Sequence, residues 1–393
     1  MKPKNLSHIR QLNKKNVLMA LWENGPISRA DLSRLTKLHK STISSLMNEL
    51  IDEGLVVELG EGRSKIGRKP TLLHLNKDFP LFIAIDIKVR DTFIALYDLS
   101  AARKKITKFN NSNLLTRPEK YVERLHKTLM DFLETKEYDS IKAIGVSVQG
   151  MTNHSDGKVL FAPNMGWKNV PLGTMLKKYF DNDMEILIDN DANLALLAEK
   201  WRGSVLRKDD KSAVFLSVNE GVGSGIMIEG KLYRGVTSRA GEFGHTTISL
   251  DGPLCHCGNT GCLERFASVI TLIDNCFDGE CREKDIIKAL SVTKELYLKG
   301  DKKAHQALHN EAKYLGVGIA NIINAIDPSV VIVGGYIRVV WELIENHVIE
   351  EVRRRLAIRT PESVRIVGSS FQGLENLEGA AILAVSTVIP TQG

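Results

Sequence analysis

The chain of 393 residues contains few cysteines and no long apolar run. No stretch approaches the ~18 consecutive apolar residues that a membrane-spanning helix needs. The first fifteen residues are polar and basic, without the apolar segment of a signal peptide. The chain has five cysteines, and three of them lie in one short loop typical of a metal site, which fits a reducing compartment better than a disulfide scaffold. We therefore expect a cytoplasmic protein without a membrane partner.

The chain also lacks an acidic surplus, and its net charge of +6 is unevenly distributed. Residues 1–80 contain 14 Lys and Arg against 8 Asp and Glu, whereas residues 81–393 contain 39 of each kind. A basic surplus confined to one segment favours a polyanion such as DNA as the partner of that segment. A solvated basic face would give the same composition, so charge alone does not decide.

Three of the five cysteines, Cys255, Cys257 and Cys262, lie close together in a glycine-containing loop. With His245 they make a Cys3His set that suits a structural zinc ion, Zn2+. Because four protein ligands close the coordination shell, this metal would hold the shape of the loop and would not activate water. The alternative is a disulfide or a set of free cysteines, but two cysteines separated by one residue would form a strained disulfide.

The pattern Glu-x-x-His followed by Cys-x-Cys-Gly-x-x-Gly-Cys-x-Glu, from Glu242 to Glu264, resembles the ROK family of sugar kinases and sugar-responsive repressors. The resemblance covers roughly Leu81 to the C-terminus. It implies an α/β, actin-like or hexokinase-like duplicated fold of two lobes, with a ligand between them. It also implies that His245 and the three cysteines bind zinc, and that Glu242, His245 and Glu264 contact the hydroxyl groups of a sugar.

A second segment, Asn190-Asp191-Ala-Asn, is similar to the Asn-Asp-Ala-Asn of the same family. The resemblance implies that Asn190 and Asp191 bond sugar hydroxyls, and that the kinases use the matching aspartate as a base. Gly150 and Asn164 match further pocket positions. Such a polar set suits a neutral polyol, because each hydroxyl needs a donor and an acceptor. From the residues alone, Asp191 could instead be the N-cap of a helix.

Residues 1–80 predict a winged helix-turn-helix. Apolar residues at helical spacing indicate helices over about 13–23, 29–36 and 41–52, and Ser28 is placed to cap the second. A tight turn between the second and third helices is typical of a helix-turn-helix. Any pair of amphipathic helices would look similar, so this pattern leaves an alternative open.

The second helix is expected to bury Ala30, Leu32 and Leu35. The start of the third helix carries small or polar side chains that can reach base edges or phosphates. These candidate DNA-binding residues are His39, Lys40, Ser41, Thr42, Ser44, Ser45 and Asn48.

Two strand-like stretches, Leu55–Leu59 and Thr71–Leu75, flank a basic segment with several glycines. A hairpin with a basic tip is typical of a wing, whose side chains enter a minor groove or contact phosphate. Its Gly-Arg-Lys-Pro also resembles the Gly-Arg-Arg-Pro of ROK repressors. The alternative is a solvated basic turn. The candidate DNA contacts of the wing are Arg63, Arg68 and Lys69.

Strands and helices alternate after a predicted boundary at residues 77–80, which is typical of an α/β domain. We therefore expect a winged helix-turn-helix over residues 1–80 and a two-lobed ROK domain over residues 81–393. The predicted strands include Leu81–Ile87, Ile141–Val148 and Ala213–Val218.

The two segments that match the family's phosphate-binding loops depart from its pattern. Asp-x-Gly-Gly-Thr is replaced by Asp86-Ile-Lys-Val-Arg90, and Gly-Thr-Gly-x-Gly by Asn219-Glu-Gly-Val-Gly223. Backbone N–H groups cradle a phosphate where glycine permits a close approach. A carboxylate at Glu220, ~4 Å from a phosphate charge, would cost about 4 kcal/mol at an effective dielectric of 20. We therefore expect no kinase activity.

Together these patterns predict a sequence-specific DNA-binding transcriptional regulator, a repressor of sugar-utilisation genes whose sugar effector changes its affinity for operator DNA. A homodimer or homotetramer would match a palindromic operator. Two short stretches, Leu232-Tyr-Arg-Gly-Val and Ala162-Pro-Asn-Met-Gly-Trp, look most like xylose repressors, so the effector is xylose or another monosaccharide. One alternative is an active ROK sugar kinase with an appended DNA-binding domain. Another is a regulator with a vestigial pocket that responds to a protein partner.

Overall fold

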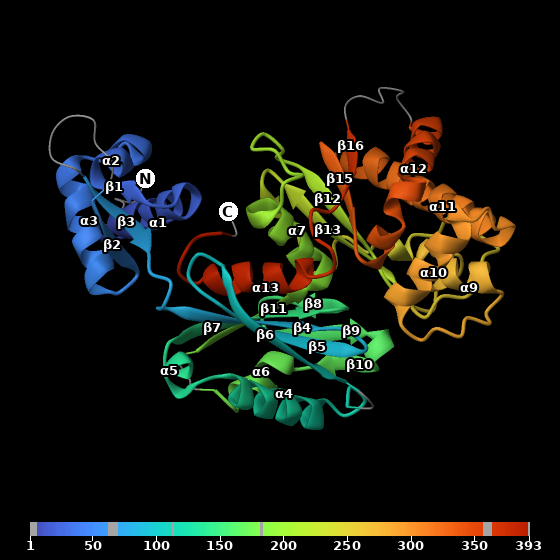
Figure 1. Cartoon of the computed structure of the whole chain (residues 1–393), viewed down its shortest axis with the longest axis horizontal. Helices are drawn as coiled ribbons and strands as arrows, with labels where there is room; N and C mark the ends of the chain where they lie inside the picture. Colours follow the sequence, from blue (N-terminus) through green and yellow to red (C-terminus); the bar gives the residue numbers. More distant parts are fainter. Residues whose placement is uncertain (1–5, 62–69, 112–113, 181–183, 357–363, 392–393) are drawn as a thin grey trace. The chain divides into compact units, whose positions relative to one another are not determined.

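The computed structural model describes residues 6–61, 70–111, 114–180, 184–356 and 364–391 (Figure 1). The chain divides into two compact units, each assembled from separate stretches of sequence. Unit 1 consists of residues 1–146, 172–188 and 380–393, and unit 2 consists of residues 147–171 and 189–379. None of the helices in these described ranges combines the length and the apolar character that crossing a membrane requires.

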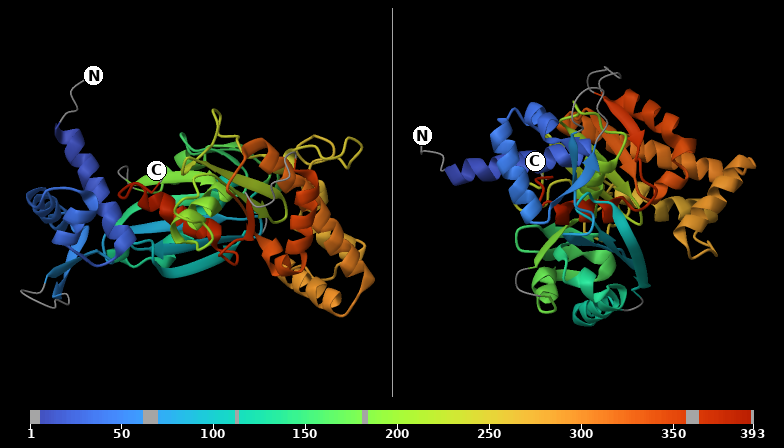
Figure 2. Two further views of the ribbon diagram at one scale, coloured as in Figure 1. Left: turned by 90° about the horizontal axis from the view of Figure 1, so that it is seen from above. Right: turned by 60° about the vertical axis from the view of Figure 1, so that its left-hand side comes forward.

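Unit 1 begins with the predicted winged helix-turn-helix. Its elements are α1 (Leu6–Asn24), β1 (Ile27–Ser28), α2 (Arg29–Thr36), α3 (Lys40–Asp52), β2 (Val56–Glu61) and β3 (Thr71–Leu75). The three strands form one antiparallel sheet in the order β1-β3-β2. The first helix begins earlier than predicted, and its N-terminal end reaches beyond the body of this domain (Figure 2).

Local signals set the bounds of α2. The side chain of Ser28 accepts a hydrogen bond from the Asp31 backbone N–H at 3.1 Å, so the predicted cap is confirmed. Lys37, in the left-handed region at φ 56°, ends the helix. The expected burial of Ala30 and Leu35 is wrong, because Leu32 is the buried residue of α2 and Leu35 is 53% exposed. Leu35 follows Leu32 by three positions and is therefore turned from it by about 60° around the helix axis. It lies outside the narrow face that α2 packs against the rest of the domain.

The flanks of the predicted wing are paired, with Val56 opposite Leu75 and Val57 opposite His74. The basic tip between them lies outside the described residues, and so do three candidate DNA contacts: Arg63, Arg68 and Lys69.

The rest of unit 1 is built on a five-stranded sheet with the order β11-β7-β4-β5-β6. Its elements are β4 (Leu81–Ile87), β5 (Asp91–Tyr97), β6 (Arg103–Asn110), α4 (Pro118–Phe132), α5 (Thr135–Tyr138), β7 (Ile141–Val148), α6 (Leu172–Lys177), β11 (Glu185–Asn190) and α13 (Glu375–Val385). The two strands β7 and β11 and the helix α13 continue from one unit into the other along the chain.

Helices cover this sheet, which explains why all seven residues of β4 are buried. The helices α4 and α6 lie on the same face (Figures 1 and 2). Tyr121 of α4 shares a hydrogen bond of 2.7 Å with Thr92 of β5. The backbone of α13 packs so closely on β7 that a Cβ at Gly145 would lie 1.9 Å from the Ala380 carbonyl oxygen.

Unit 2 contains a small sheet, β10-β9-β8, and a second five-stranded sheet, β14-β13-β12-β15-β16. Its elements are β8 (Met151–Asn153), β9 (Lys158–Ala162), η1 (Pro163–Met165), β10 (Trp167–Val170), α7 (Asp191–Arg202), β12 (Ala213–Val218), β13 (Val222–Ile228), β14 (Lys231–Leu232), η2 (Phe243–His245), α8 (Glu264–Ala267), α9 (Val269–Phe277), α10 (Ile286–Leu298), α11 (Lys302–Ile326), β15 (Val330–Gly334), η3 (Tyr336–Val339), α12 (Trp341–Arg355) and β16 (Arg365–Gly368).

The two faces of the second sheet belong to two hydrophobic clusters. On β12, Val214 and Leu216 join the cluster formed with α9 to α12. Ala213 and Phe215 point the other way and join residues of α7. Successive side chains of a strand point to opposite faces, so the continuous apolar run of this strand reflects burial on both sides.

Both five-stranded sheets have the same strand order. In each sheet, the strand that comes first in the chain is central, the next two strands in the chain lie on one side of it, and the last two lie on the other side. The orders are β11-β7-β4-β5-β6 and β16-β15-β12-β13-β14. In both, the first three strands form an antiparallel ribbon. This repetition confirms the duplicated, actin-like or hexokinase-like fold that the resemblance implied.

Candidate functional site

A hollow in unit 2 is lined by all seven residues expected to contact a sugar. They come from stretches of the chain that are far apart in sequence, and the fold of unit 2 brings them together. They are Gly150, Asn164, Asn190, Asp191, Glu242, His245 and Glu264.

The carboxyl end of β11 carries the first part of this site. Asn190 is the N-cap of α7, because its Oδ1 accepts hydrogen bonds from the Ala192 and Asn193 backbone N–H groups at 2.9 and 3.2 Å. Its Nδ2 donates to the Gly150 carbonyl oxygen and to Asp191 Oδ1, both at 3.0 Å. The alternative that Asp191 is the helix cap is therefore wrong. Asp191 is the first helical residue, and its carboxylate lies on the hollow.

Gly150 lies next to Asn190, between β7 and β8. A Cβ there would come within 2.6 Å of the Ala162 Cβ and 2.7 Å of the Phe161 carbonyl oxygen. This glycine therefore lets the start of β8 lie against β9. Asn164 follows β9 in the short helix η1 and also lines the hollow.

The third part of the site is the pair of glutamates that flank the cysteine loop. Glu264 Oε2 accepts a hydrogen bond from the Val222 backbone N–H at 3.0 Å, which ties the start of α8 to β13. Burial raises the pKa of Glu242, and the negative charge of Glu264 raises it further, while His245 opposes the shift. Two carboxyl groups and an imidazole thus face one hollow, and such groups can accept and donate hydrogen bonds to the hydroxyls of one ligand.

Cys255, Cys257, Cys262 and His245 form a cluster whose ligand atoms all lie within 4.8 Å of one another. The sulfur atoms of Cys257 and Cys262 are 3.7 Å apart, and Cys255 Sγ is 3.7 Å from His245 Nδ1. Tetrahedral zinc with Zn–S bonds of about 2.3 Å places its sulfur ligands roughly 3.8 Å apart. These two separations therefore match those of a tetrahedral metal site, and the four ligand atoms are close enough together to hold one ion.

Burial raises the pKa of Cys255 to about 12 and also raises the pKa of Cys262. A metal ion bound by these thiols would deprotonate them. Gly261 permits the fold of the loop, because it lies at φ 71° and a Cβ there would be 1.6 Å from the Ser249 carbonyl oxygen.

His245 serves both parts of the site. Its Nδ1 faces the cysteine cluster, which leaves Nε2 on the other side of the ring as the atom that can reach the hollow. A metal ion on Nδ1 would fix both the tautomer and the orientation of this ring.

The hollow also contains residues that sequence reasoning did not assign to it. Ser217 and Asn219 stand at the carboxyl end of β12, a place where polar side chains gather in α/β sheets, and that signal was available in the sequence. Phe161 and Met151 gave no such signal. The further lining residues are Gln149, Met151, Phe161, Pro163, Ser217, Asn219, Gly221, Val222 and Gly223.

The segment that matches the family's second phosphate loop is held by contacts within unit 2. Asn219 Oδ1 accepts a hydrogen bond from the Tyr336 backbone N–H at 2.8 Å, and its Nδ2 donates to Ser217 Oγ at 2.9 Å. The turn between β15 and η3, which contains Gly335, is also hydrogen-bonded. The Gly335 backbone N–H donates to Glu375 Oε1 at 3.1 Å.

The segment that matches the first phosphate loop lies in unit 1. Asp86 is fully buried, and its Oδ2 is 3.6 Å from the ammonium group of Lys88. Lys88 stands where the family has a glycine, and its ammonium group also lies 5.6 Å from the centre of the Phe93 ring.

The predicted DNA-binding residues of α3 lie at its N-terminal end and along its outer face. Among them His39, Lys40, Ser41, Ser45 and Asn48 are exposed, and Thr42 and Ser44 are partly buried. Arg34 of α2 and Lys37, which ends that helix, line the same shallow depression as His39, Lys40 and Ser41, and sequence reasoning did not include them.

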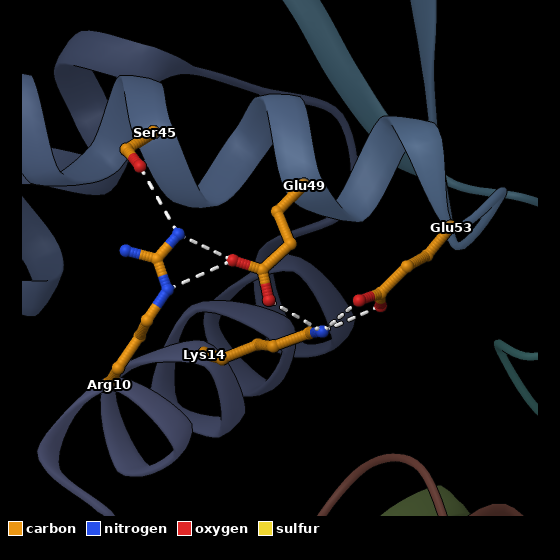
Figure 3. A network of polar contacts seen from close by, with 5 residues as sticks. All are labelled: Arg10, Lys14, Ser45, Glu49 and Glu53. Atoms are coloured by element: carbon orange, nitrogen blue, oxygen red, sulfur yellow. Dashed lines mark hydrogen bonds and ion pairs between the residues drawn. The ribbon is translucent and has the colours of Figure 1, made fainter. Parts of the chain in front are cut away.

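Two of these residues have partners in the domain itself. Ser45 Oγ accepts a hydrogen bond from Arg10 Nη2 at 3.2 Å, and Asn48 Oδ1 accepts one from Arg29 Nη1 at 3.1 Å. Figure 3 shows that Arg10 and Lys14 of α1 reach across to the face of α3 that carries Ser45, Glu49 and Glu53.

Two family models match different parts of the chain. Residues 82–387 match the model of the ROK family, and residues 11–64 match the model of the MarR family.

The most similar proteins include regulators and kinases. The xylose repressor of Caldicellulosiruptor bescii is 33% identical, over 97% of this chain and 97% of its own length. A ROK family transcriptional regulator, a homologue of the Escherichia coli Mlc protein, superposes with a TM-score of 0.76 at 27% identity and covers 95% of both chains. A ROK family glucokinase from Streptomyces griseus, solved with glucose and AMPPNP, superposes with a TM-score of 0.65 at 26% identity, over 77% of this chain and 99% of the enzyme.

Proposed function

The chain belongs to the ROK family, and we propose that it is a sequence-specific DNA-binding repressor of sugar-utilisation genes that responds to a monosaccharide. The observation that carries this proposal is the hollow of unit 2, which gathers seven polar or pocket-forming residues in a chain that also has a winged helix-turn-helix. The match to a regulator over 95% of both chains supports the same combination. The DNA-binding part is assigned to residues 1–80 and the effector-binding part to residues 81–393.

The effector is a neutral sugar. Asn164 supplies a donor and an acceptor, while Asp191, Glu242 and Glu264 supply acceptors. Asn190 lines the hollow as a proposed sugar contact, and it also shapes the site as the cap of α7, where its Oδ1 accepts two backbone hydrogen bonds. Xylose is the first candidate, because the repressor that covers 97% of this chain is named for it.

A structural zinc ion holds the effector site in shape. His245, Cys255, Cys257 and Cys262 bind it, and their spacing supports a tetrahedral shell. Zinc held by these four residues would fix the loop between Glu242 and Glu264, whose carboxyl groups both line the hollow. His245 then contacts the sugar through Nε2.

Operator DNA is the partner of the winged helix-turn-helix. Its first contacts come from His39, Lys40 and Ser41 at the start of α3, with Thr42 and Ser44 beside them. A homodimer or homotetramer would present two such domains to a palindromic operator. A DNA partner supports the cytoplasm as the proposed location.

Sugar changes operator affinity because it binds one conformation of the regulator better than another. A coupling free energy of about 1–3 kcal/mol between the two sites changes operator affinity roughly five- to 150-fold. For a repressor of sugar-utilisation genes, the sign that we propose is that sugar lowers operator affinity, so that the genes are expressed when the sugar is present.

The contacts of both phosphate-loop segments support regulation without phosphorylation. In unit 1 the ammonium group of Lys88 neutralises Asp86 in the space that glycine leaves open in the kinases. In unit 2 the side chain of Asn219, in the second segment, is bonded to the backbone N–H group of Tyr336 and to Ser217 Oγ. Glu220 adds a negative charge where a phosphate would lie.

The test combines operator binding with sugar binding. We expect purified protein to bind its operator, to bind D-xylose or another of a panel of monosaccharides by calorimetry, and to release the operator when that sugar is added. Asp191→Ala should abolish the sugar response and leave sugar-free operator binding intact.

Two outcomes would favour the alternatives. Sugar-dependent turnover of ATP would favour the kinase with an appended DNA-binding domain. Operator binding that is insensitive to every sugar, with no heat of sugar binding, would favour a regulator controlled by a protein partner.

The wing is tested by its effect on salt dependence. Arg68→Ala with Lys69→Ala should weaken operator binding and flatten the plot of log affinity against log salt by about 0.9 for each phosphate that the variant no longer neutralises. Lys208→Ala with Lys302→Ala, two exposed lysines of unit 2, is the matched control. An unchanged slope in the wing variant would count against the wing.

A further inference from the structure

Asp189 lies directly before the pocket residues Asn190 and Asp191 but is not among the residues that line the hollow. Its side chain is 2% exposed. Oδ1 accepts hydrogen bonds from the Asn190 backbone N–H at 2.8 Å and from Asn193 Nδ2 at 3.0 Å. Oδ2 faces the guanidinium group of Arg234, 2.6 Å from Nη2 and 2.8 Å from Nε. One buried carboxylate thus joins the start of α7 to a residue 45 positions further along the chain.

A third segment reaches the same carboxylate. His154, in the turn between β8 and β9, has its Nδ1 3.7 Å from Asp189 Oδ2. The strand β9 that follows this turn leads into η1 and the pocket residue Asn164.

Arg234 forms the base of the loop that precedes Glu242. Its carbonyl oxygen accepts a hydrogen bond from the Ala240 backbone N–H at 3.1 Å, which closes the loop over residues 235–239. Glu242 follows two residues after this closure, and η2 with His245 comes next. The position of Arg234 therefore sets where the segment carrying Glu242 begins.

We propose that Arg234 and Asp189 are positioning residues of the effector site, which hold the segments bearing Asn164, Asn190–Asp191 and Glu242 at the mutual distances that a monosaccharide requires. This inference rests on the proposed sugar-binding function and adds residues that do not touch the hollow. It also gives a role to the arginine of the Leu232-Tyr-Arg-Gly-Val stretch, which the sequence pattern singled out without explaining.

The energetics of buried ion pairs support a role in specificity. Replacing a buried ion pair with apolar residues of similar volume is often neutral or stabilising, so such a pair is weak evidence of stability alone. Outer-layer residues that orient metal ligands change metal affinity by about ten- to a hundredfold. We expect a pair that orients hydroxyl-binding residues to change sugar affinity by a similar factor.

The experiment compares three variants of the full-length, zinc-loaded protein. Arg234→Met removes the charge and keeps much of the side-chain volume. Arg234→Lys keeps the charge but loses the planar donor pair. Arg239→Met is the matched control, since Arg239 lies in the same loop and is exposed. Calorimetry with D-xylose, D-glucose and N-acetyl-D-glucosamine gives the sugar Kd, and fluorescence anisotropy gives the operator Kd without sugar.

We expect Arg234→Met to raise the Kd of the bound sugar on the order of ten- to a hundredfold, with Arg234→Lys in between and Arg239→Met unchanged. Zinc content and sugar-free operator affinity should match those of the unaltered protein. An unchanged sugar Kd in folded Arg234→Met would overturn the proposal. So would a lowered thermal midpoint without any change in sugar Kd, because that result assigns the pair a structural role only.

A double-mutant cycle separates a pair from two independent residues. Asp189→Asn keeps an acceptor for the Asn190 N–H but loses the charge that faces Arg234. If the two residues act together, the double variant should have a sugar Kd no higher than that of the single variant with the higher sugar Kd. Additive losses in sugar affinity would contradict the proposal.

Asp191→Ala distinguishes failure of this proposal from failure of the proposed function. If Asp191→Ala abolishes sugar binding while Arg234→Met leaves it intact, only the positioning role fails. If the unaltered protein binds none of the three sugars, both proposals fail.

Discussion

Glu49 in the winged helix-turn-helix and Glu199 in unit 2 each hold segments of the chain together, but with different donors. Glu49 of α3 binds Arg10 and Lys14 of α1 at the surface (Figure 3). Glu199 of α7 is fully buried and accepts hydrogen bonds from Ser369 Oγ, the Ser370 N–H and Ser370 Oγ at 2.6 to 2.8 Å.

The pKa values of these two carboxyl groups move in opposite directions. The hydrogen bonds from Lys14 and Arg10 lower the pKa of Glu49. Burial raises the pKa of Glu199, although its three neutral donors act against that shift. The contrast teaches that a carboxylate stays charged where cations reach it at the surface, and that neutral donors do not fully replace water in the interior.

The largest loss of stability in unit 2 is expected from a substitution in the Cys3His set. Cys262→Ser should lower the zinc content from about one ion per chain to near zero and should strongly lower the thermal midpoint, since structural zinc contributes folding free energy outright. Metal analysis and thermal unfolding measure both.

Cys276→Ser is the control for this substitution, because Cys276 is a buried cysteine outside the cluster. A Cys262→Ser protein with unchanged metal content would contradict the assignment of the ligands.

The next largest effect is expected from Glu199→Ala. The substitution leaves the buried Ser369 hydroxyl without its acceptor, whereas the two donors of the exposed Ser370 can turn to water. An unsatisfied buried group costs about 1–3 kcal/mol, so we expect the free energy of unfolding to fall by about that amount, measured by urea denaturation. A loss below about 1 kcal/mol would mean that water or another group replaces the carboxyl group.

The pH dependence of stability tests the direction of the Glu199 shift. A raised pKa means that the folded state keeps a proton that the unfolded state releases near the ordinary value of 4.5. The contribution of Glu199 is therefore fully present below that pH and is lost as the pH rises through the raised pKa. Relative to Glu199→Gln, whose side chain does not titrate, the unaltered protein should lose stability across this window. If the free energy of unfolding of the unaltered protein instead rose relative to that of Glu199→Gln as the pH increased, the prediction would be contradicted.

The smallest effect is expected from Glu49→Gln. Surface ion pairs contribute about 0–1 kcal/mol, and 1 M salt should remove most of the difference from the unaltered protein. Because the pKa of Glu49 is lowered, its contribution is present above pH 4.5 and is lost as the pH falls through the lowered value, opposite to Glu199. A loss above about 2 kcal/mol, unaffected by salt, would break the comparison.

Sequence reasoning succeeded where the determining signal is local. The cap at Ser28, the strand Thr71–Leu75 and the cluster of Cys255, Cys257 and Cys262 each depend on residues within a few positions of one another. The burial of Leu35 was predicted wrongly, because it depends on which neighbours α2 meets and not on its own periodicity.

The parts that sequence reasoning missed depend on long-range contacts. The pairing of Asp189 with Arg234 joins residues 45 positions apart, and no spacing rule links them. The small sheet β8–β10 consists of strands of three to five residues, too short for a period-2 pattern to identify. Asn190 was expected to contact sugar through its amide, but only the folded chain reveals that this amide also caps α7.

The imidazole of His245 faces the cysteine cluster through one nitrogen and leaves the other for the hollow. On the roles proposed here, metal and sugar share one ring, so their binding free energies are linked. By reciprocity, whatever free energy zinc adds to sugar binding, sugar must add to zinc retention. A cell short of zinc would then lose its response to the sugar even with that sugar abundant, and a cell rich in the sugar would keep the metal in this protein longest.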